Sequence, residues 1–221
     1  MSGTRFMLAT GNRHKLGEFH KILAPFEVLP MPAWVELPPE DVESFAGNAR
    51  GKALGLARAL ASAGSPGSAA PRAGSGPPDL FCLADDSGLE VEALGWAPGV
   101  ISARYAGVDG PGADAANVAR LLHEMVGCAG PRARRARFVC SVVALAPDLT
   151  EYAATGHWWG AIAAAPRGEG GFGYDPVFVP QGSDLTVAEW PQTDKDQASH
   201  RALAGRALLE RLRRERLLYG G

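Results

Sequence analysis

Hydrophobic and polar positions follow two distinct periods along this chain. Runs of consecutive apolar residues predict buried strands, and apolar residues spaced three, four and seven apart predict amphipathic helices. Strands that alternate with helices in this way predict an α/β fold. The second period predicts helices over 15–23 and 115–125, and two more that Ser44 and Ser199 cap at their N-termini. The first period predicts strands over 5–10, 80–84, 138–145, 176–179 and part of 151–164.

Two segments between these elements have the composition of loops. The proline-rich stretch over 25–39 is predicted to be a connection. Residues 62–79 are nearly all Gly, Ser, Pro and Ala, so we expect a flexible loop with too few apolar side chains to pack. Because the elements on both sides of this loop fit one system of sheet and helices, we predict a single domain over residues 1–221.

Composition then narrows the class of protein. With 46% hydrophobic and 21% charged residues the chain is ordinary for a globular domain, and no apolar run approaches the ~20 residues of a transmembrane helix. The first residues lack the apolar core and cleavage site of a signal peptide. The three cysteines, Cys82, Cys128 and Cys140, form no CxxC pair. We therefore expect a cytoplasmic protein with neither a disulfide framework nor a cysteine-bound zinc.

The formal net charge of −2 bears on possible partners. Proteins that coat duplex nucleic acid or bind anionic membranes carry a basic excess, so we expect neither partner here. One alternative stays open, a nucleic-acid-binding module built on a local basic run. That run has no interleaved aromatic residue and adjoins a buried strand, which favours a solvated strand entrance instead. The run consists of Arg132, Arg134, Arg135 and Arg137.

The first candidate for chemistry is the turn between the strand over 5–10 and the helix over 15–23. A strand that ends in a small polar turn and opens a helix presents backbone N–H groups and the positive end of the helix dipole, which suits a phosphate group. The turn lacks the GxxxxGK[ST] pattern of a P-loop, and by itself it favours an ordinary strand-to-helix turn. It consists of Thr10, Gly11, Asn12, Arg13, His14 and Lys15.

A second candidate follows the strand over 80–84, where Asp85, Asp86 and Ser87 are consecutive. Two carboxylates at the end of a buried strand are unfavourable unless a cation lies beside them. Neighbouring strand residues point in opposite directions, so one aspartate can face a site while the other braces the loop. A divalent metal and the activation of water both fit, and the alternative is an aspartate pair that caps a turn. On the helix after Ser44, Asn48 and Lys52 lie one turn apart at the edge of the apolar stripe, where they can face a cleft.

Two further candidates lie near the end of the chain. Glycines around the aromatic residues at 170–176 allow the backbone to approach a flat ligand on which Phe172 stacks; alternatively Phe172 and Tyr174 belong to the core of a glycine-rich turn. Lys195 with the segment 199–201 makes a cationic edge that can read an anion or a base, or else it is a surface helix start.

Together these segments resemble the inosine triphosphate pyrophosphatase-like family of noncanonical purine nucleoside triphosphate pyrophosphatases. The resemblance spans nearly the whole chain, and its second block is the most specific. The matching blocks are LATGNRHKLGEF, LADDSGLEVEALGWAPGVISARYAG, GGFGYDPVFVP and LTVAEWPQTDKDQASHRALAG. The resemblance implies a curled mixed sheet with flanking helices, two lobes around a nucleotide-binding cleft, a homodimer and a requirement for Mg²⁺.

The resemblance also implies roles for individual residues. Residues 10–15 would hold the triphosphate, Asp86 would bind the metal and accept a proton, and Ser87 would contact the substrate. An acidic metal ligand should fall at 38–41, where we choose Glu40, although the match there can slip by one residue. The pocket for base and sugar would be lined by Phe172, Gly173, Tyr174, Asp175, Lys195, His200 and Arg201.

The implied reaction is hydrolysis of ITP, dITP or XTP between the α- and β-phosphates, which gives a monophosphate and pyrophosphate. If His200, Arg201 or nearby N–H groups donate to the 6-oxo group of the base, ATP meets donor with donor and is rejected. Related pyrophosphatases that act on modified pyrimidine triphosphates are the enzyme alternative. The TGN turn and the Ser-His-Arg segment disfavour that alternative.

Overall fold

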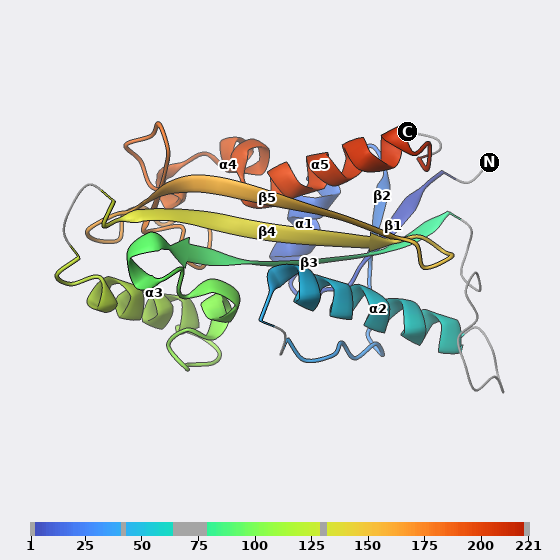
Figure 1. Ribbon diagram of the computed structural model, residues 1–221, viewed down its shortest axis with the longest axis horizontal. Coiled ribbons are helices and arrows are strands. Elements are labelled where there is room, and N and C mark those ends of the chain that lie inside the picture. The colour runs from blue at the N-terminus through green and yellow to red at the C-terminus, as the bar shows by residue number, and fades with distance from the viewer. Residues whose placement is uncertain (1–2, 41–42, 64–78, 129–131, 219–221) are drawn as a thin grey trace. The chain divides into compact units, whose positions relative to one another are not determined.

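The strands of this protein form one mixed sheet, as the sequence predicts. The structure is a computed structural model and describes residues 3–40, 43–63, 79–128 and 132–218. The strand order is β2-β1-β3-β4-β5-β6, with β1 parallel to both β2 and β3 and β5 antiparallel to β6; Figure 1 labels β1 to β5. The strands are β1 (Arg5–Leu8), β2 (Glu27–Pro30), β3 (Leu80–Val91), β4 (Arg135–Leu145), β5 (Glu151–Ile162) and β6 (Phe178–Pro180).

Helices alternate with these strands along the chain, which confirms the predicted α/β class. In the part of the chain that the structure describes, no helix combines the length and apolar composition that crossing a bilayer requires. The α-helices are α1 (Arg13–Ile22), α2 (Phe45–Ala63), α3 (Ala113–Glu124), α4 (Gln192–Ala198) and α5 (His200–Arg214). Short 3₁₀ helices cover Glu92–Leu94, Gly99–Arg104 and Val187–Glu189.

The chain divides into two compact units. Unit 1 comprises residues 1–86, 140–156 and 201–221, and unit 2 comprises residues 87–139 and 157–200. The chain passes from unit 1 to unit 2 within β3, between the adjacent residues Asp86 and Ser87.

In unit 1 the strands bury both faces, because successive side chains alternate between two apolar clusters. Phe6 and Leu8 of β1 pack in one cluster with side chains of α1 and α5. Ala9, which follows β1, packs in the other cluster with side chains of α2. Figure 1 shows α5 and α2 on opposite sides of these strands. The period of two along the strands and of about 3.6 along the helices therefore produces a layered core.

Unit 2 has an aromatic core around Phe138. The Phe138 ring lies 4.7 Å from Phe178 of β6 and 6.5 Å from Trp158 of β5, centroid to centroid. Trp158 also makes an edge contact with Trp190 at 5.6 Å. These contacts join β4, β5, β6 and the residue that follows the third 3₁₀ helix.

Several predicted elements differ from the structure. The strand predicted over 80–84 continues as β3 to Val91, so Asp85 and Asp86 lie inside a strand and not after its end. Part of the predicted connection over 25–39 is strand β2, because the backbone of β1 offers a parallel edge. The loop predicted over 62–79 overlaps α2, which continues to Ala63, while residues 64–78 lie outside the described residues.

Candidate active site

The turn that opens α1 is closed by its own side chains. Asn12 is the N-cap: its Oδ1 accepts the backbone N–H of His14 at 2.8 Å and that of Lys15 at 3.3 Å. The backbone N–H of Asn12 in turn donates to Thr10 Oγ1 at 3.1 Å. The predicted strand–turn–helix is confirmed, but three of the backbone N–H groups expected to meet a phosphate, those of Asn12, His14 and Lys15, already have an acceptor. On this exposed turn, the groups that can still donate to a phosphate include the guanidinium of Arg13 and the side-chain amide nitrogen of Asn12.

Asp85 lies on the face of β3 that packs against α1 and α5, and cations surround it. Lys15 Nζ is 2.9 Å from its Oδ2, and Arg201 Nε is 3.4 Å from the same oxygen. Arg201 also donates through Nη1 to Glu18 at 3.1 Å. Although burial alone would raise the pKa of Asp85, Lys15, Arg201 and Lys52 hold it well below its usual range. Two basic and two acidic groups, all in unit 1, thus form a paired buried network.

Asp86 points to the opposite face of β3, toward α2. Its Oδ2 accepts from Asn48 Nδ2 at 2.9 Å, and its Oδ1 lies 3.8 Å from Lys52 Nζ. Burial raises the pKa of Asp86 above its ordinary value, against the opposing effects of Lys52 and Asn48, and the charge of Glu40 raises it further. The expectation that Asn48 and Lys52 do not face bulk water is confirmed by their 3% and 7% exposure. Asp86 is therefore a carboxylate suited to accepting a proton.

Glu40 reaches Lys52 because the surface of α2 has no side chain at Gly55. A Cβ on Gly55 would lie 2.7 Å from Pro38 Cδ, so only glycine allows the segment that carries Pro38 to lie this close to the helix. Glu40 follows Pro38 by two residues, and its Oε1 lies 2.5 Å from Lys52 Nζ. The carboxylates of Glu40 and Asp86 thus both contact one ammonium group.

In unit 2, Asp175 joins the glycine-rich loop to α4. Its Oδ2 accepts the backbone N–H of Phe172 at 2.9 Å and lies 2.5 Å from Lys195 Nζ. Lys195 Nζ also lies 4.4 Å from the centroid of the Phe172 ring. Lys195 and Asp175 are each 4% exposed. A planar aromatic ring and a buried cation are therefore held together, which suits a flat ligand with an acceptor at its edge.

Other predicted residues of unit 2 have packing partners. Tyr174 is buried and donates its hydroxyl to the carbonyl of Ser102 at 2.9 Å, so burial raises the pKa of its phenol. Gly173 N–H donates to Asp114 Oδ2 at 2.7 Å. The His200 ring stacks on Phe138 at 4.7 Å with an interplanar angle of 11°. Tyr174 thus matches the core alternative that its sequence context left open.

Gly171→Ala tests how strictly this loop is constrained. A Cβ at position 171 would lie 2.0 Å from Asp175 Oδ2, and φ of +74° is strained for any residue with a side chain. We expect the substitution to separate Asp175 from Phe172 and Lys195 and to raise KM at least about tenfold, the effect of one lost charged hydrogen bond. Gly17→Ala, where a Cβ meets no atom within 4 Å, is the matched control. Steady-state kinetics on both variants measure this effect. A KM for Gly171→Ala equal to that for Gly17→Ala would contradict the expectation.

The predicted site residues are divided between the two units, and in unit 1 they lie on both faces of β3. Sequence reasoning did not assign roles to Glu18 or Asp114. The spacing of Glu18 from Lys15, three residues on α1, was the only signal for the former. Unit 1 holds Thr10, Gly11, Asn12, Arg13, His14, Lys15, Glu40, Asp86 and Arg201, and unit 2 holds Ser87, Phe172, Gly173, Tyr174, Asp175, Lys195 and His200.

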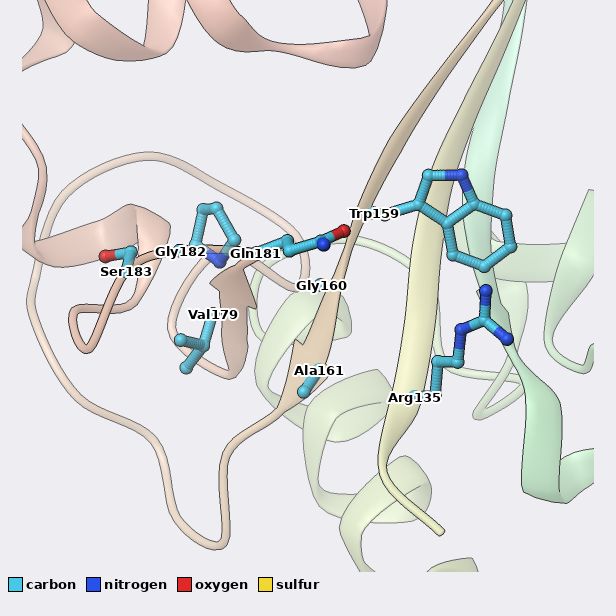
Figure 2. Close-up of a pocket in the computed structure, with 9 residues that line it drawn as sticks. Arg135, Trp159, Gly160, Ala161, Val179, Gln181, Gly182 and Ser183 are labelled. Atoms are coloured by element: carbon cyan, nitrogen blue, oxygen red, sulfur yellow. The ribbon is translucent and has the colours of Figure 1, made fainter. Parts of the chain in front are cut away.

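The arginines of the basic run at 132–137 contact residues other than the predicted site residues. Arg135 lies 4.4 Å from the Trp159 ring centroid and 3.2 Å from Glu92, while Arg137 pairs with Glu90 at 2.6 Å. The tertiary fold therefore places the aromatic ring of Trp159 against arginines whose run in the sequence has no interleaved aromatic residue. A pocket of about 360 Å³ is lined in part by Arg135 and Trp159, which Figure 2 draws as sticks, and none of the residues predicted for the active site is among the described residues that line it.

Comparisons with known proteins agree over the whole fold. A family model described as the Ham1 family matches residues 6–211. A protein named dITP/XTP pyrophosphatase from Nocardia farcinica is 41% identical over 96% of this chain and 96% of its own length. One of the same name from Ralstonia nicotianae is 42% identical over 95% and 96%. The solved structure of a HAM1 protein from Coxiella burnetii has a TM-score of 0.78 at 31% identity, over 96% of this chain and 99% of that one.

Proposed function

Because this chain belongs to the Ham1 family, we propose that it hydrolyses the noncanonical purine nucleoside triphosphates ITP, dITP and XTP to the monophosphate and pyrophosphate. The observation that carries the proposal is the buried carboxylate of Asp86 beside Lys52 and Glu40, in a chain that is 41–42% identical to two dITP/XTP pyrophosphatases. Such a reaction needs a proton acceptor next to cationic groups that bind phosphate.

Mg²⁺ fits the donor set in unit 1. Glu40 and Asp86 both contact Lys52, so their oxygens already converge on one positive charge. Carboxylate oxygens are the ligands that Mg²⁺ prefers, and the ion usually takes one or two of them and completes its shell with water and substrate phosphates. Bound there, Mg²⁺ supplies charge that neutralises phosphate oxygens and promotes loss of a proton from water.

Asp86 is proposed to take the proton from the water that attacks the α-phosphorus. Asn48 holds one of its oxygens by a hydrogen bond of 2.9 Å, which sets the orientation of the carboxylate. The raised pKa of Asp86 makes it a stronger proton acceptor than an ordinary aspartate. The leaving group is then pyrophosphate, whose negative charge Lys52 and the side chains of Arg13 and Asn12 are proposed to bind.

Base recognition is proposed for unit 2. Phe172 offers a ring for stacking, and the ammonium of Lys195 is held beside it by Asp175. An ammonium group is only a donor, so it matches the 6-oxo acceptor of hypoxanthine or xanthine and opposes the amino group of adenine. The backbone of Ser87 and the imidazole of His200 are proposed to complete the contacts. The buried ion pairs of Arg201 with Asp85 and Glu18 support a positioning role for Arg201 in place of direct base reading.

A substrate panel with product identification tests the function. We expect kcat/KM for ITP, dITP and XTP to exceed those for ATP and GTP, with ATP disfavoured by up to ~10⁴-fold because donors left unpaired are costly. Pyrophosphate should be the first product, and chelation of Mg²⁺ with EDTA should stop turnover. Orthophosphate as the first product, or equal values for ITP and ATP, would refute the proposal.

The assembly and location of the protein belong to the same proposal. The resemblance to inosine triphosphate pyrophosphatases supports a homodimer, and the odd, widely spaced cysteines support a reducing cytoplasm. Light scattering of the purified protein measures the first of these directly.

A further inference from the structure

Lys52 contacts both carboxylates, those of Glu40 and Asp86, that would hold a divalent cation. Its Nζ is 2.5 Å from Glu40 Oε1 and 3.8 Å from Asp86 Oδ1, and the residue is 7% exposed. One lysine therefore pairs with both carboxylates that are proposed as metal ligands. Among the described residues, no group of three or more His, Cys, Asp or Glu side chains is arranged to hold a metal ion.

The charge of Lys52 and the small number of carboxylate ligands both weaken the binding of free metal. A second positive charge near a partly buried ammonium is repelled, since Coulomb energy in such surroundings is several times larger than in bulk water. The described residues offer two carboxylates beside Lys52, those of Glu40 and Asp86, and these are few ligands to set against that repulsion. Free Mg²⁺ therefore gains little by binding to unit 1 alone.

A triphosphate changes both the repulsion between Lys52 and the metal and the number of ligands that the metal can bind. Its oxygens add ligands for the metal, and its negative charge gives Lys52 a new partner, because lysine binds phosphate well as a point charge. Lys52 is not anchored to Glu40 by a rigid two-pronged geometry, as an arginine would be, and its flexible stem allows the ammonium to turn from one oxygen to another.

We propose that Lys52 holds Glu40 and Asp86 in the metal-free protein and keeps free divalent cations out, so that metal enters together with the triphosphate. The inference rests on the proposed function, since it takes a nucleoside triphosphate as the substrate. It assigns to Lys52 a selective role: the site responds to the metal–triphosphate complex and not to metal alone.

The test is direct binding of Mn²⁺, as a probe for Mg²⁺, to the substrate-free protein by calorimetry. Removing the charge in Lys52→Gln should tighten Mn²⁺ binding at least about tenfold, the effect of one opposing unit charge a few ångströms away. Lys52→Met, which keeps the apolar stem in its buried position, should behave the same way. Lys52→Arg keeps the charge and should bind Mn²⁺ as weakly as the wild type.

Two controls make the result specific. Lys21→Gln removes an equal charge from the exposed side of α1 and should leave Mn²⁺ binding unchanged. Adding Glu40→Gln to Lys52→Gln should reverse the gain, because it removes one of the two ligands. Circular dichroism melts identify any variant that does not fold, and then the other charge-removing variant is used.

Binding to the wild type that is as tight as binding to Lys52→Gln and Lys52→Met would overturn the inference, as would weakened binding to both. Neither outcome depends on turnover, so failure of this inference is distinguishable from failure of the proposed function, which the substrate panel measures. Tighter Mn²⁺ binding together with lost ITP hydrolysis in Lys52→Gln is the expected result.

Discussion

Asp86→Asn is expected to abolish hydrolysis of ITP while the protein stays folded. Asparagine keeps the volume and can still pair with Asn48, but it cannot accept a proton and is a weaker ligand for metal. Loss of a general base typically lowers kcat by ~10²–10⁴-fold. Since burial raises the pKa of Asp86, its charge opposes folding at neutral pH, so the neutral side chain should not lower the melting temperature.

Single-turnover kinetics at saturating Mg²⁺ and a thermal melt together check this expectation. More than about a tenth of the wild-type rate, well above what the ~10²–10⁴ range allows, would remove Asp86 from the proton-transfer step. A large loss of stability would instead show that Asp86 supports the fold of β3.

Asp85→Asn, one residue away, is expected to lower the stability of the protein, in contrast to Asp86→Asn. Asp85 neutralises Lys15 and Arg201 in a buried network, and breaking such a pair leaves an uncompensated charge. We expect a loss of about 3–5 kcal/mol in the free energy of unfolding, or about 6–20 °C in melting temperature. The isosteric amide leaves the packing volume unchanged, so the loss measures charge and not cavity formation.

The pH dependence of this loss has a definite sign. The pKa of Asp85 is lowered in the folded protein, so its contribution is complete above the pKa of about 4 that an unfolded aspartate has, and it is lost as pH falls further. Denaturation at pH 7 and pH 3 should therefore show a smaller difference between wild type and Asp85→Asn at the lower pH. Arg201→Gln is the companion variant, and equal stability of both variants with the wild type would contradict the network.

Much of the fold was readable from local pattern. The alternation of apolar runs and helical stripes predicted the α/β class, and the Ser44 cap was confirmed by its hydrogen bond to Gly47. These features depend on side chains a few residues apart, which sequence displays directly. Strand β2 was missed because a short proline-bounded strand is stabilised chiefly by its pairing with β1, a contact between distant segments.

The same division applies to the candidate site. The sequence by itself determined which residues are candidates for chemistry: the paired aspartates, the turn at 10–15, Lys52 and the loop before Asp175. The family resemblance already assigned proton acceptance to Asp86, and only the tertiary structure decided the surroundings of each aspartate. Asp85 and Asp86 are chemically identical neighbours, and the pleat of β3 turns one toward Lys15 and Arg201 and the other toward Asn48 and Lys52. Ion pairing and burial are properties of that surrounding, so one carboxylate becomes a buried counter-ion and the other a candidate base.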